Sequence, residues 1–324
     1  DAHPHVGTDK LPGVIVNMRK TIERCGGEIH FSTKVTNLLI REKQVYGVVA
    51  GNKEYAAEHV ILATGHSARD VYRMLYRCHV ALEAKDFAVG LRLEHPQHDI
   101  DCIQYHSAEG RGKWLPAAEY SFVTNVDGRG VYSFCMCPGG VVVPAATGKE
   151  QQVVNGMSSS ARNTPWANSA MVTSVGQEEL RAMNYEGLFA GMEFQEALER
   201  RAWQEGGGGL YAPAQVLTDF LAGKEGKVLP STSYKPGIKA SLISEWFPDI
   251  LCNRLKIGLS QFGHKAPGFV SDRALLLGVE TRTSSPVRIP RNAQCMHPEI
   301  VGVYPCEEGA GYAGGIISAA MDGE

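Results

Sequence analysis

The sequence lacks several features that would assign it at once to a large class of proteins. Its 324 residues contain no apolar run that approaches the ~20 residues of a membrane-spanning helix. There is no excess of positive charge, because 32 Lys and Arg stand against 35 Asp and Glu and leave a net charge of −3. That balance argues against a nucleic-acid partner. No basic segment followed by an apolar one opens the chain, so no secretory signal is indicated.

Several catalytic signatures are also absent. The 11 histidines show no H-E-x-x-H spacing, and there is no G-x-S-x-G nucleophile turn and no Walker loop. Metalloprotease, hydrolase and nucleotide triphosphatase functions therefore have no support. Eight cysteines are spaced irregularly, which fits reduced thiols in a cytoplasmic protein better than a disulfide framework, and we expect no metal site.

The C-terminal stretch carries the strongest pattern. Ile300 to Tyr304 is a short apolar run that predicts a buried strand. A turn with two carboxylates follows, then four glycines within seven residues, and Ile316 to Met321 predicts an apolar helix. A helix that begins after a glycine turn offers free N–H groups and a partial positive charge to a negatively charged ligand.

The glycines of this stretch spell G-x-G-x-x-G at positions 309, 311 and 314, the pattern of a dinucleotide-binding turn. A complete nucleotide-binding unit needs about 20 further residues with a second strand and an acidic residue. We therefore do not expect a complete unit here. The alternative interpretation is a helix packed tightly on a strand, where the glycines serve only for clearance.

The first 85 residues predict a helix, a strand, a β-meander and a second helix. Thr8 or Asp9 would cap the first helix, which ends at Gly26-Gly27. The predicted strands and the second helix are Glu28–Phe31, a hairpin of Val35–Ile40 and Val45–Ala50, the strand His59–Ala63, and the helix Ala68–Lys85.

The segment Glu308 to Gly315, with its preceding strand, resembles the C-terminal flavin motif of FAD-dependent oxidoreductases of the glutathione-reductase-type fold. It is most similar to the bacterial group of uncharacterised FAD-dependent dehydrogenases. The resemblance implies that Glu308 bonds a ribityl hydroxyl, and that the following residues line the phosphate, ribityl and ring: Gly309, Ala310, Gly311, Tyr312, Ala313 and Gly314. Glu307 stands where this family has a small residue, which leaves open which carboxylate faces the flavin.

A second segment supports the same resemblance. Ala63-Thr64-Gly65 ends a strand after a meander, where these flavoproteins place a turn near the FAD pyrophosphate and adenosine. The resemblance also implies that Val35 touches the adenine through its backbone. No strand followed by G-x-G-x-x-G precedes Thr8, although the family requires one. We therefore expect the chain to be the C-terminal portion of a longer protein, and FAD to bind the full-length protein while this fragment is colourless and inactive.

The expected fold class is α/β (α+β overall), a partial FAD/NAD(P)-binding three-layer ββα domain with a large inserted mixed α/β domain. Residues 1–85 and 291–324 would form the cofactor domain, and residues 86–290 the insertion that supplies the substrate side. Within the insertion we predict a strand at Asp86–Leu93 and further strands between Phe262 and Arg291. Helices are predicted around Glu178–Met183, over Gly187–Gln204 and over Ala214–Leu221.

Two segments of the insertion offer candidate catalytic residues. Phe134 to Gly140 resembles the same dehydrogenase group, and Cys135 and Cys137 would lie on one face of a strand. They are interpreted as a redox or substrate-contacting pair, as a metal-binding pair, or as two packed thiols. Met157 to Ser169 predicts a long loop, where Arg162 and Asn168 would bind an anionic or carbonyl substrate group or simply lie on the surface.

The leading hypothesis is an FAD-dependent oxidoreductase that acts on an unidentified small molecule by hydride transfer through the flavin N5, with NAD(P)H as a candidate electron donor. One alternative is a flavoprotein-fold binding or regulatory module without turnover. Another is an FAD monooxygenase or halogenase. The sequence does not identify a catalytic base.

Overall fold

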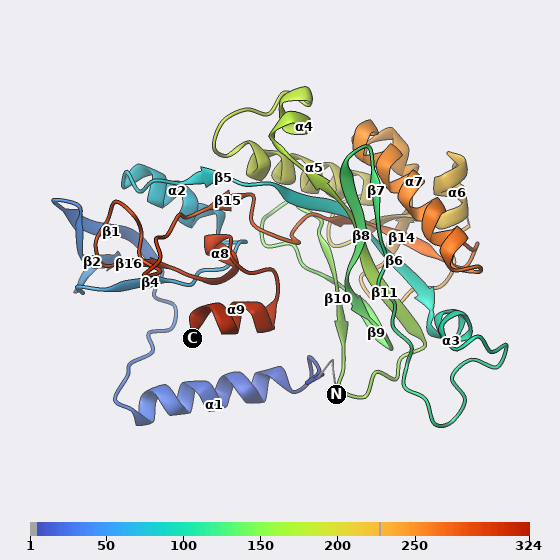
Figure 1. Cartoon of the computed structure of the whole chain (residues 1–324), viewed down its shortest axis with the longest axis horizontal. Coiled ribbons are helices and arrows are strands. Elements are labelled where there is room, and N and C mark those ends of the chain that lie inside the picture. Colours follow the sequence, from blue (N-terminus) through green and yellow to red (C-terminus); the bar gives the residue numbers. More distant parts are fainter. Residues whose placement is uncertain (1–4, 227) are drawn as a thin grey trace. The chain divides into compact units, whose positions relative to one another are not determined.

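The structure is a computed structural model that describes residues 5–226 and 228–324 (Figure 1). The chain divides into two compact units, each built from segments that are discontinuous in sequence. The small unit comprises Glu28–Phe87, Val175–Gln195 and Arg282–Glu324. The large unit comprises the residues up to Gly27, Ala88–Ser174 and Glu196–Thr281. Each unit is described by itself.

The small unit combines a three-stranded antiparallel sheet, two short strand pairs and short helices. The sheet has the order β1-β2-β3, and the pairs are β16-β4 and β15-β5. The elements are β1 Val35–Arg41, β2 Gln44–Ala50, β3 Lys53–Ala56, β4 Val60–Leu62, α2 Arg69–Arg77, β5 Glu83–Ala84, α4 Gln177–Ala182, β15 Val287–Arg288, β16 Val303–Pro305, α8 Glu307–Ala310 and α9 Ile316–Gly323.

The predicted hairpin is confirmed. Valine, leucine and isoleucine favour the pleated backbone of β1 and β2, which pair antiparallel. Glu42 and Lys43 form the turn at φ of +49° and +62°, the left-handed conformation that a tight two-residue hairpin turn requires.

The strands that precede the two glycine turns are neighbours. β4 and β16 pair in parallel, with Val60 opposite Val303 and Leu62 opposite Pro305 (Figure 1). The two segments therefore belong to one sheet. Because the strands are parallel, the turns that follow them emerge at the same edge.

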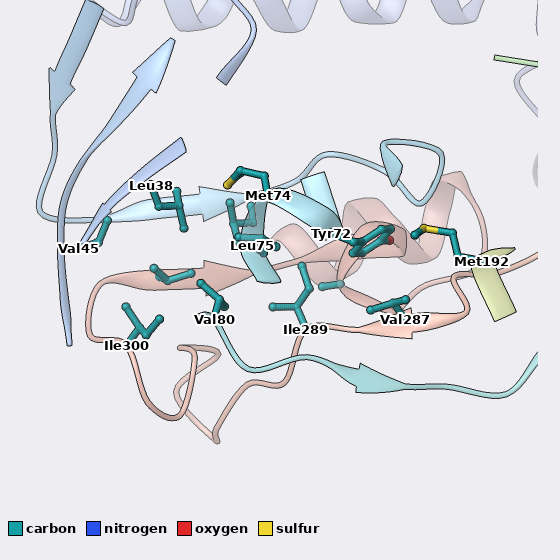
Figure 2. Packing of buried hydrophobic residues seen from close by; sticks show 13 residues of the cluster. Leu38, Val45, Tyr72, Met74, Leu75, Val80, Met192, Val287, Ile289 and Ile300 are labelled. Carbon is teal, nitrogen blue, oxygen red and sulfur yellow. The ribbon is translucent and has the colours of Figure 1, made fainter. Parts of the chain in front are cut away.

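One hydrophobic cluster holds this unit together (Figure 2). It gathers side chains from the hairpin, α2 and both strand pairs, and they are at most 5% exposed. They are Leu38, Val45, Leu62, Tyr72, Met74, Leu75, Val80, Met192, Val287, Ile289, Ile300, Val303 and Ala310. Each Å² of apolar surface that is buried stabilises the fold by about 25 cal/mol. The cluster therefore holds in place the strands from which the two turns project.

The large unit is built on a seven-stranded sheet of order β13-β12-β14-β6-β11-β8-β7, accompanied by the antiparallel pair β9-β10. β13 and β12 run parallel, while β12-β14, β14-β6, β11-β8 and β8-β7 are antiparallel. Its elements are α1 Leu11–Arg24, β6 Phe87–Pro96, α3 Gln97–Tyr105, β7 Val123–Val126, β8 Arg129–Cys137, β9 Gly140–Pro144, β10 Val154–Ser158, β11 Trp166–Val175, α5 Ala190–Gly206, β12 Ala212–Val216, α6 Leu217–Ala222, β13 Ile238–Ala240, a 3-10 turn Ile243–Glu245, α7 Asp249–Lys265 and β14 Leu275–Glu280; α5 and β6 begin in the small unit.

The helix α7 is the main element that the sequence-based prediction missed. It covers the sheet beside β7 and β8 (Figure 1). Its buried residues Leu251, Leu255, Leu259 and Phe262 recur at helical spacing, and Pro248 precedes the first turn. This helical spacing is visible in the sequence. No helix is predicted there, however, and strands are predicted after Phe262.

One predicted element of the N-terminal part is wrong, and two predicted helices are shorter than expected. Glu28–Phe31 forms no strand; the Phe31 side chain is 68% exposed. The helix predicted over Ala68–Lys85 ends at Cys78, because His79 adopts a φ of +57° and the chain then extends into β5. The helix predicted over Ala214–Leu221 is split, since β12 runs to Val216 before α6 begins.

The predicted loop from Met157 to Ser169 is also wrong at both ends, where β10 and β11 occupy it. The fold class itself is confirmed as mixed α/β with a large mixed sheet. The domain boundaries at residues 85 and 290 stay predictions. Among the described residues, no helix is both long and apolar enough to cross a membrane.

Candidate cofactor site

The candidate site is formed by the two turns that follow β4 and β16 in the small unit. The N–H of Cys306 donates to the carbonyl oxygen of Leu62 at 3.0 Å, which continues the strand pairing to its last residue. Beyond that bond the two chains diverge into their turns. Ala63 and Thr64 are exposed there, so this edge of the sheet is open to a ligand.

Glu307 joins the two turns through its side chain. Its Oε1 accepts hydrogen bonds from the N–H of Gly65 at 2.8 Å and from the N–H of Gly309 at 3.0 Å. Its Oε2 accepts from the N–H of Glu308 at 2.8 Å. Hydrogen bonds to a charged acceptor are stronger than neutral ones, so this carboxylate is a firm link between segments far apart in sequence.

Glu308 makes a different kind of contact. Its Oε2 lies 3.1 Å from Nδ1 of His66, and the two side chains are 25% and 14% exposed. The Glu308 carboxylate therefore lies at the surface of the site, beside a residue of the other turn. Glu307 uses both of its carboxylate oxygens to accept backbone N–H groups, whereas Glu308 contacts a side chain, so Glu308 is the more available of the two. A ligand contact of Glu308 stays a prediction.

The glycines of the site play two different roles. A Cβ at Gly65 or at Gly314 would meet nothing within 4 Å, so the backbone at both positions borders open space. At Gly309 a Cβ would lie 2.8 Å from Oε1 of Glu307 and 3.0 Å from the backbone of Gly65. Gly311 adopts a φ of +86°, a conformation that glycine accepts without strain.

The middle of the motif belongs to the protein interior. Gly309, Ala310 and Gly311 are buried, and the N–H of Ile289 donates to the Ala310 carbonyl oxygen at 3.2 Å. Tyr312 is 37% exposed, and Ala313 and Gly314 are half-buried. The predicted ligand-lining residues therefore divide into a packed part and an exposed part.

Arg291 fixes the segment after the turn. Its guanidinium bonds both carboxylate oxygens of Asp322 near the end of α9, at 2.9 and 2.5 Å, and lies 4.0 Å from the ring centroid of Tyr312. Hydrogen bonding to Arg291 lowers the pKa of Asp322. Asp322 in turn accepts the N–H of Glu307 at 2.7 Å, so the end of α9 is tied back to the start of α8.

Two further residues support this arrangement, and the sequence-based prediction named neither. The Tyr72 hydroxyl donates to the Gly309 carbonyl oxygen at 2.8 Å and lies 2.9 Å from Oγ of Ser285. Burial raises the pKa of Tyr72 to about 12, so it stays a neutral donor. The only sequence signal for it was its place on the inner face of α2.

Val35 lies at the start of β1. Its neighbour Lys34 forms an ion pair with Asp70 in the first turn of α2, with 2.6 Å between Nζ and Oδ2. Since α2 follows the Thr64–Gly65 turn, this pair links the start of β1 to the segment after that turn. The Val35 side chain is 38% exposed.

The two candidate catalytic cysteines, Cys135 and Cys137 of the large unit, lie at a β-bulge. The β8–β11 register shifts between Asn168 and Ala170, and Cys135 adopts a φ of +47°. The Cys135 side chain is exposed, while that of Cys137 is half-buried. The prediction that both lie alike on one strand face is wrong, because the bulge adds a residue between them and changes the alternation.

A buried arginine lies behind the bulge. Arg92 Nη2 donates to the Cys135 carbonyl oxygen at 2.8 Å and to Sγ of Cys137 at 3.4 Å. Its Nε donates to Oδ1 of Asn168 at 2.9 Å. Burial raises the pKa of the Cys137 thiol, and the Arg92 charge opposes that shift. Asn168 is fully buried in this network and so does not lie on a surface loop.

Arg162 has a φ of +46°, and its guanidinium is 3.8 Å from the Glu119 carboxylate. No group of three or more His, Cys, Asp or Glu suited to a metal ion occurs in the described parts of the chain. None of the eight cysteines, all of which the structure describes, forms a disulfide.

The chain is similar to a curated relative and to several solved structures, two of which are described below. An uncharacterized protein of Clostridium beijerinckii is 44% identical over 329 residues. The match covers the whole of this chain and 61% of that protein, so the chain spans about three-fifths of the length of its relative.

Of the solved structures, an oxidoreductase from Methanosarcina mazei is 14% identical, with a TM-score of 0.34 over 96% of this chain and 52% of that one. CtdE in complex with FAD is 11% identical, with a TM-score of 0.27 over 90% of this chain and 51% of that one. Likenesses this weak carry no argument.

The family comparison is more informative. Residues 86–283, more than half of the chain, match the family described as FAD-dependent protein, C-terminal domain-like. The protein therefore belongs to this family of FAD-dependent proteins.

Proposed function

We propose that the protein is an FAD-dependent oxidoreductase whose small unit presents its two adjoining turns to the flavin. Membership of an FAD-dependent family supports the cofactor. The observation that carries the proposal is the parallel pairing of β4 with β16. It brings Thr64 and Gly65 to the same edge as Glu308.

The residues at this edge fit an extended cofactor that carries hydroxyl groups and negative charge. The backbone at Gly65 and Gly314 borders open space, which allows close approach of a ligand. The partly exposed Glu308 carboxylate is an acceptor for a hydroxyl group. The helix α9 begins after Gly315 without a side-chain cap. The first N–H groups of a helix have no partner inside the helix and would bind a negatively charged group.

Each group then has a distinct role. When bound, FAD supplies hydride transfer at its N5. Glu308 would accept a ribityl hydroxyl and fix the orientation of the ring system. The first turn of α9 would stabilise negative charge near the ring by its partial positive charge. Ile316 and Ile317, 66% and 69% exposed, would limit access of water there.

The site is tested by titrating the protein in its natural full length with FAD, with flavin fluorescence as the signal. Glu308→Ala removes a charged hydrogen-bond acceptor, so we expect the Kd for FAD to rise about 10- to 100-fold. Adding Gly311→Leu, which forces a side chain into a φ of +86°, should abolish binding. Matched controls are Glu54→Ala, on the exposed strand β3, and Gly51→Leu, at a φ of +61° in open space.

Unchanged FAD affinity in the Glu308→Ala, Gly311→Leu variant would refute this site, provided that far-UV circular dichroism shows a folded protein. Turnover is tested separately with NAD(P)H, the proposed electron donor. Oxidation of NAD(P)H by the FAD-loaded protein supports an oxidoreductase. Tight FAD binding without turnover would instead favour a binding module, and strictly oxygen-dependent turnover a monooxygenase.

A further inference from the structure

Glu307 has an unusual backbone conformation for its residue type. Its φ is +65°, in the left-handed region that glycine occupies freely and that other residues rarely adopt. A non-glycine residue persists there only when the surrounding contacts hold it. The contacts of Glu307 are therefore the feature to explain.

Both the main chain and the side chain of Glu307 are held. Its N–H donates to Oδ2 of Asp322 at 2.7 Å. Its carboxylate accepts three backbone N–H groups at 2.8 to 3.0 Å, and one of these, Gly65, lies 242 residues away in sequence. The Gly65 bond links the two turns through the Glu307 side chain, next to the contact of Glu308 with His66.

The crowding at Gly309 belongs to the same contact. A side chain there would collide with the Glu307 carboxylate and with the Gly65 backbone. Gly309 is thus required by the approach of the two turns to each other. A Cβ built on Gly65 would meet nothing within 4 Å. The bond to Glu307 therefore holds this turn on one side and leaves its other side open.

We propose that Glu307 is a positioning residue, which locks the Thr64–Gly65 turn to the Glu308–Gly311 turn and so leaves Glu308 free to bind the cofactor. The inference rests on the proposed function for its consequence, FAD affinity. The link itself is a property of the chain without cofactor. A positioning role explains why a carboxylate occupies a position with a positive φ beside a second carboxylate.

Hydrogen exchange at the Gly65 amide measures the link directly, in the 324-residue chain without cofactor. Glu307→Gly removes the carboxylate and relieves the positive φ, and we expect Gly65 exchange to accelerate about 10-fold or more. Glu307→Gln keeps an amide oxygen that can accept from Gly65 and Gly309, so exchange should stay within about 3-fold of the original rate. Glu308→Gln should leave Gly65 exchange unchanged.

FAD affinity, measured on the protein in its natural full length, is the second readout. Glu307→Gly should weaken binding about 10-fold, and Glu307→Gln should restore most of it. Asn184→Gly controls for the backbone change itself, because it relieves a similar φ of +64° elsewhere in the small unit, and it should change neither readout.

Unchanged Gly65 exchange in Glu307→Gly would overturn the proposal, as would equal weakening of FAD binding by Glu307→Gln and Glu307→Gly. If the original protein binds no FAD, the proposed function fails, and the exchange experiment still decides whether the link exists. If the Gly65 amide exchanged faster in Glu308→Gln than in Glu307→Gly, the link would be made by Glu308, and the proposal would be rejected.

Discussion

Arg92 and Glu280 form an ion pair in the interior of the large unit, with 3.3 Å between Nη1 and Oε2 and with side chains 0% and 5% exposed. They lie on the neighbouring strands β6 and β14. The Glu280 pKa is raised because burial disfavours its charge, and the Arg92 charge opposes that shift. Each buried charge is stabilised by its partner, and the Arg92 charge also by the further hydrogen bonds of its guanidinium.

We expect removal of either partner to be costly, because it leaves the other charge buried and uncompensated. Arg92→Met and Glu280→Met should each lower the free energy of unfolding by about 3–5 kcal/mol. The loss of unfolding free energy in the double variant should be smaller than the sum of the two single losses, by more than about 1 kcal/mol.

Urea unfolding followed by tryptophan fluorescence measures this, since all four tryptophans lie in the large unit. Arg201→Met is the matched control. Arg201 forms a 2.7 Å pair with Glu205, but its side chain is 51% exposed, so the substitution should cost under about 1 kcal/mol. Simple additivity of the two buried substitutions would show that the pair is not coupled.

The bulge in β8 leads to a prediction about the two candidate catalytic cysteines. Cys135 is exposed, whereas burial raises the pKa of the Cys137 thiol and lowers its thiolate fraction. At pH 7.5, iodoacetamide should therefore modify Cys135 about ten times faster than Cys137, as followed by peptide mass spectrometry. Buried Cys252, whose pKa is also raised by burial, is the slow reference. Equal rates at Cys135 and Cys137 would mean that Arg92 stabilises a reactive thiolate.

The sequence predicted the parts of the fold that depend on local pattern. The hairpin of β1 and β2 and the strands β4 and β16 follow from runs of β-branched and apolar residues between turns. The proximity of Gly65 to the C-terminal turn could be anticipated only by resemblance to a family, since nothing local in either segment specifies a partner so far away in sequence.

The features that escaped prediction depend on tertiary contacts. The bulge at Cys135 arises from the pairing of β8 with β11, which the strand pattern of β8 alone does not reveal. The division of labour between Glu307 and Glu308 depends on which backbone N–H groups the fold brings near each carboxylate. Nothing in the local pattern distinguishes two adjacent glutamates, so only the family resemblance pointed to Glu308.

The contact between Arg291 and Asp322 leads to a prediction about pH. The guanidinium lowers the Asp322 pKa below its ordinary value in the folded protein, so the carboxylate stabilises the fold above the unfolded pKa of about 4. That contribution should be lost as the pH falls through the lower, folded pKa. The Glu307 amide, which donates to Asp322, reports on it through hydrogen exchange.

Comparison with Asp322→Asn at each pH separates this effect from the intrinsic pH dependence of exchange. Above pH 5 the Glu307 amide should exchange about five-fold faster in the variant, which corresponds to about 1 kcal/mol for a partly exposed pair. The two proteins should converge at acid pH, once Asp322 is protonated. Arg291→Met should move the convergence to higher pH, because the carboxylate then loses the group that holds its pKa down. A constant ratio at every pH would show that the charge of Asp322 contributes nothing and that only its hydrogen bond matters.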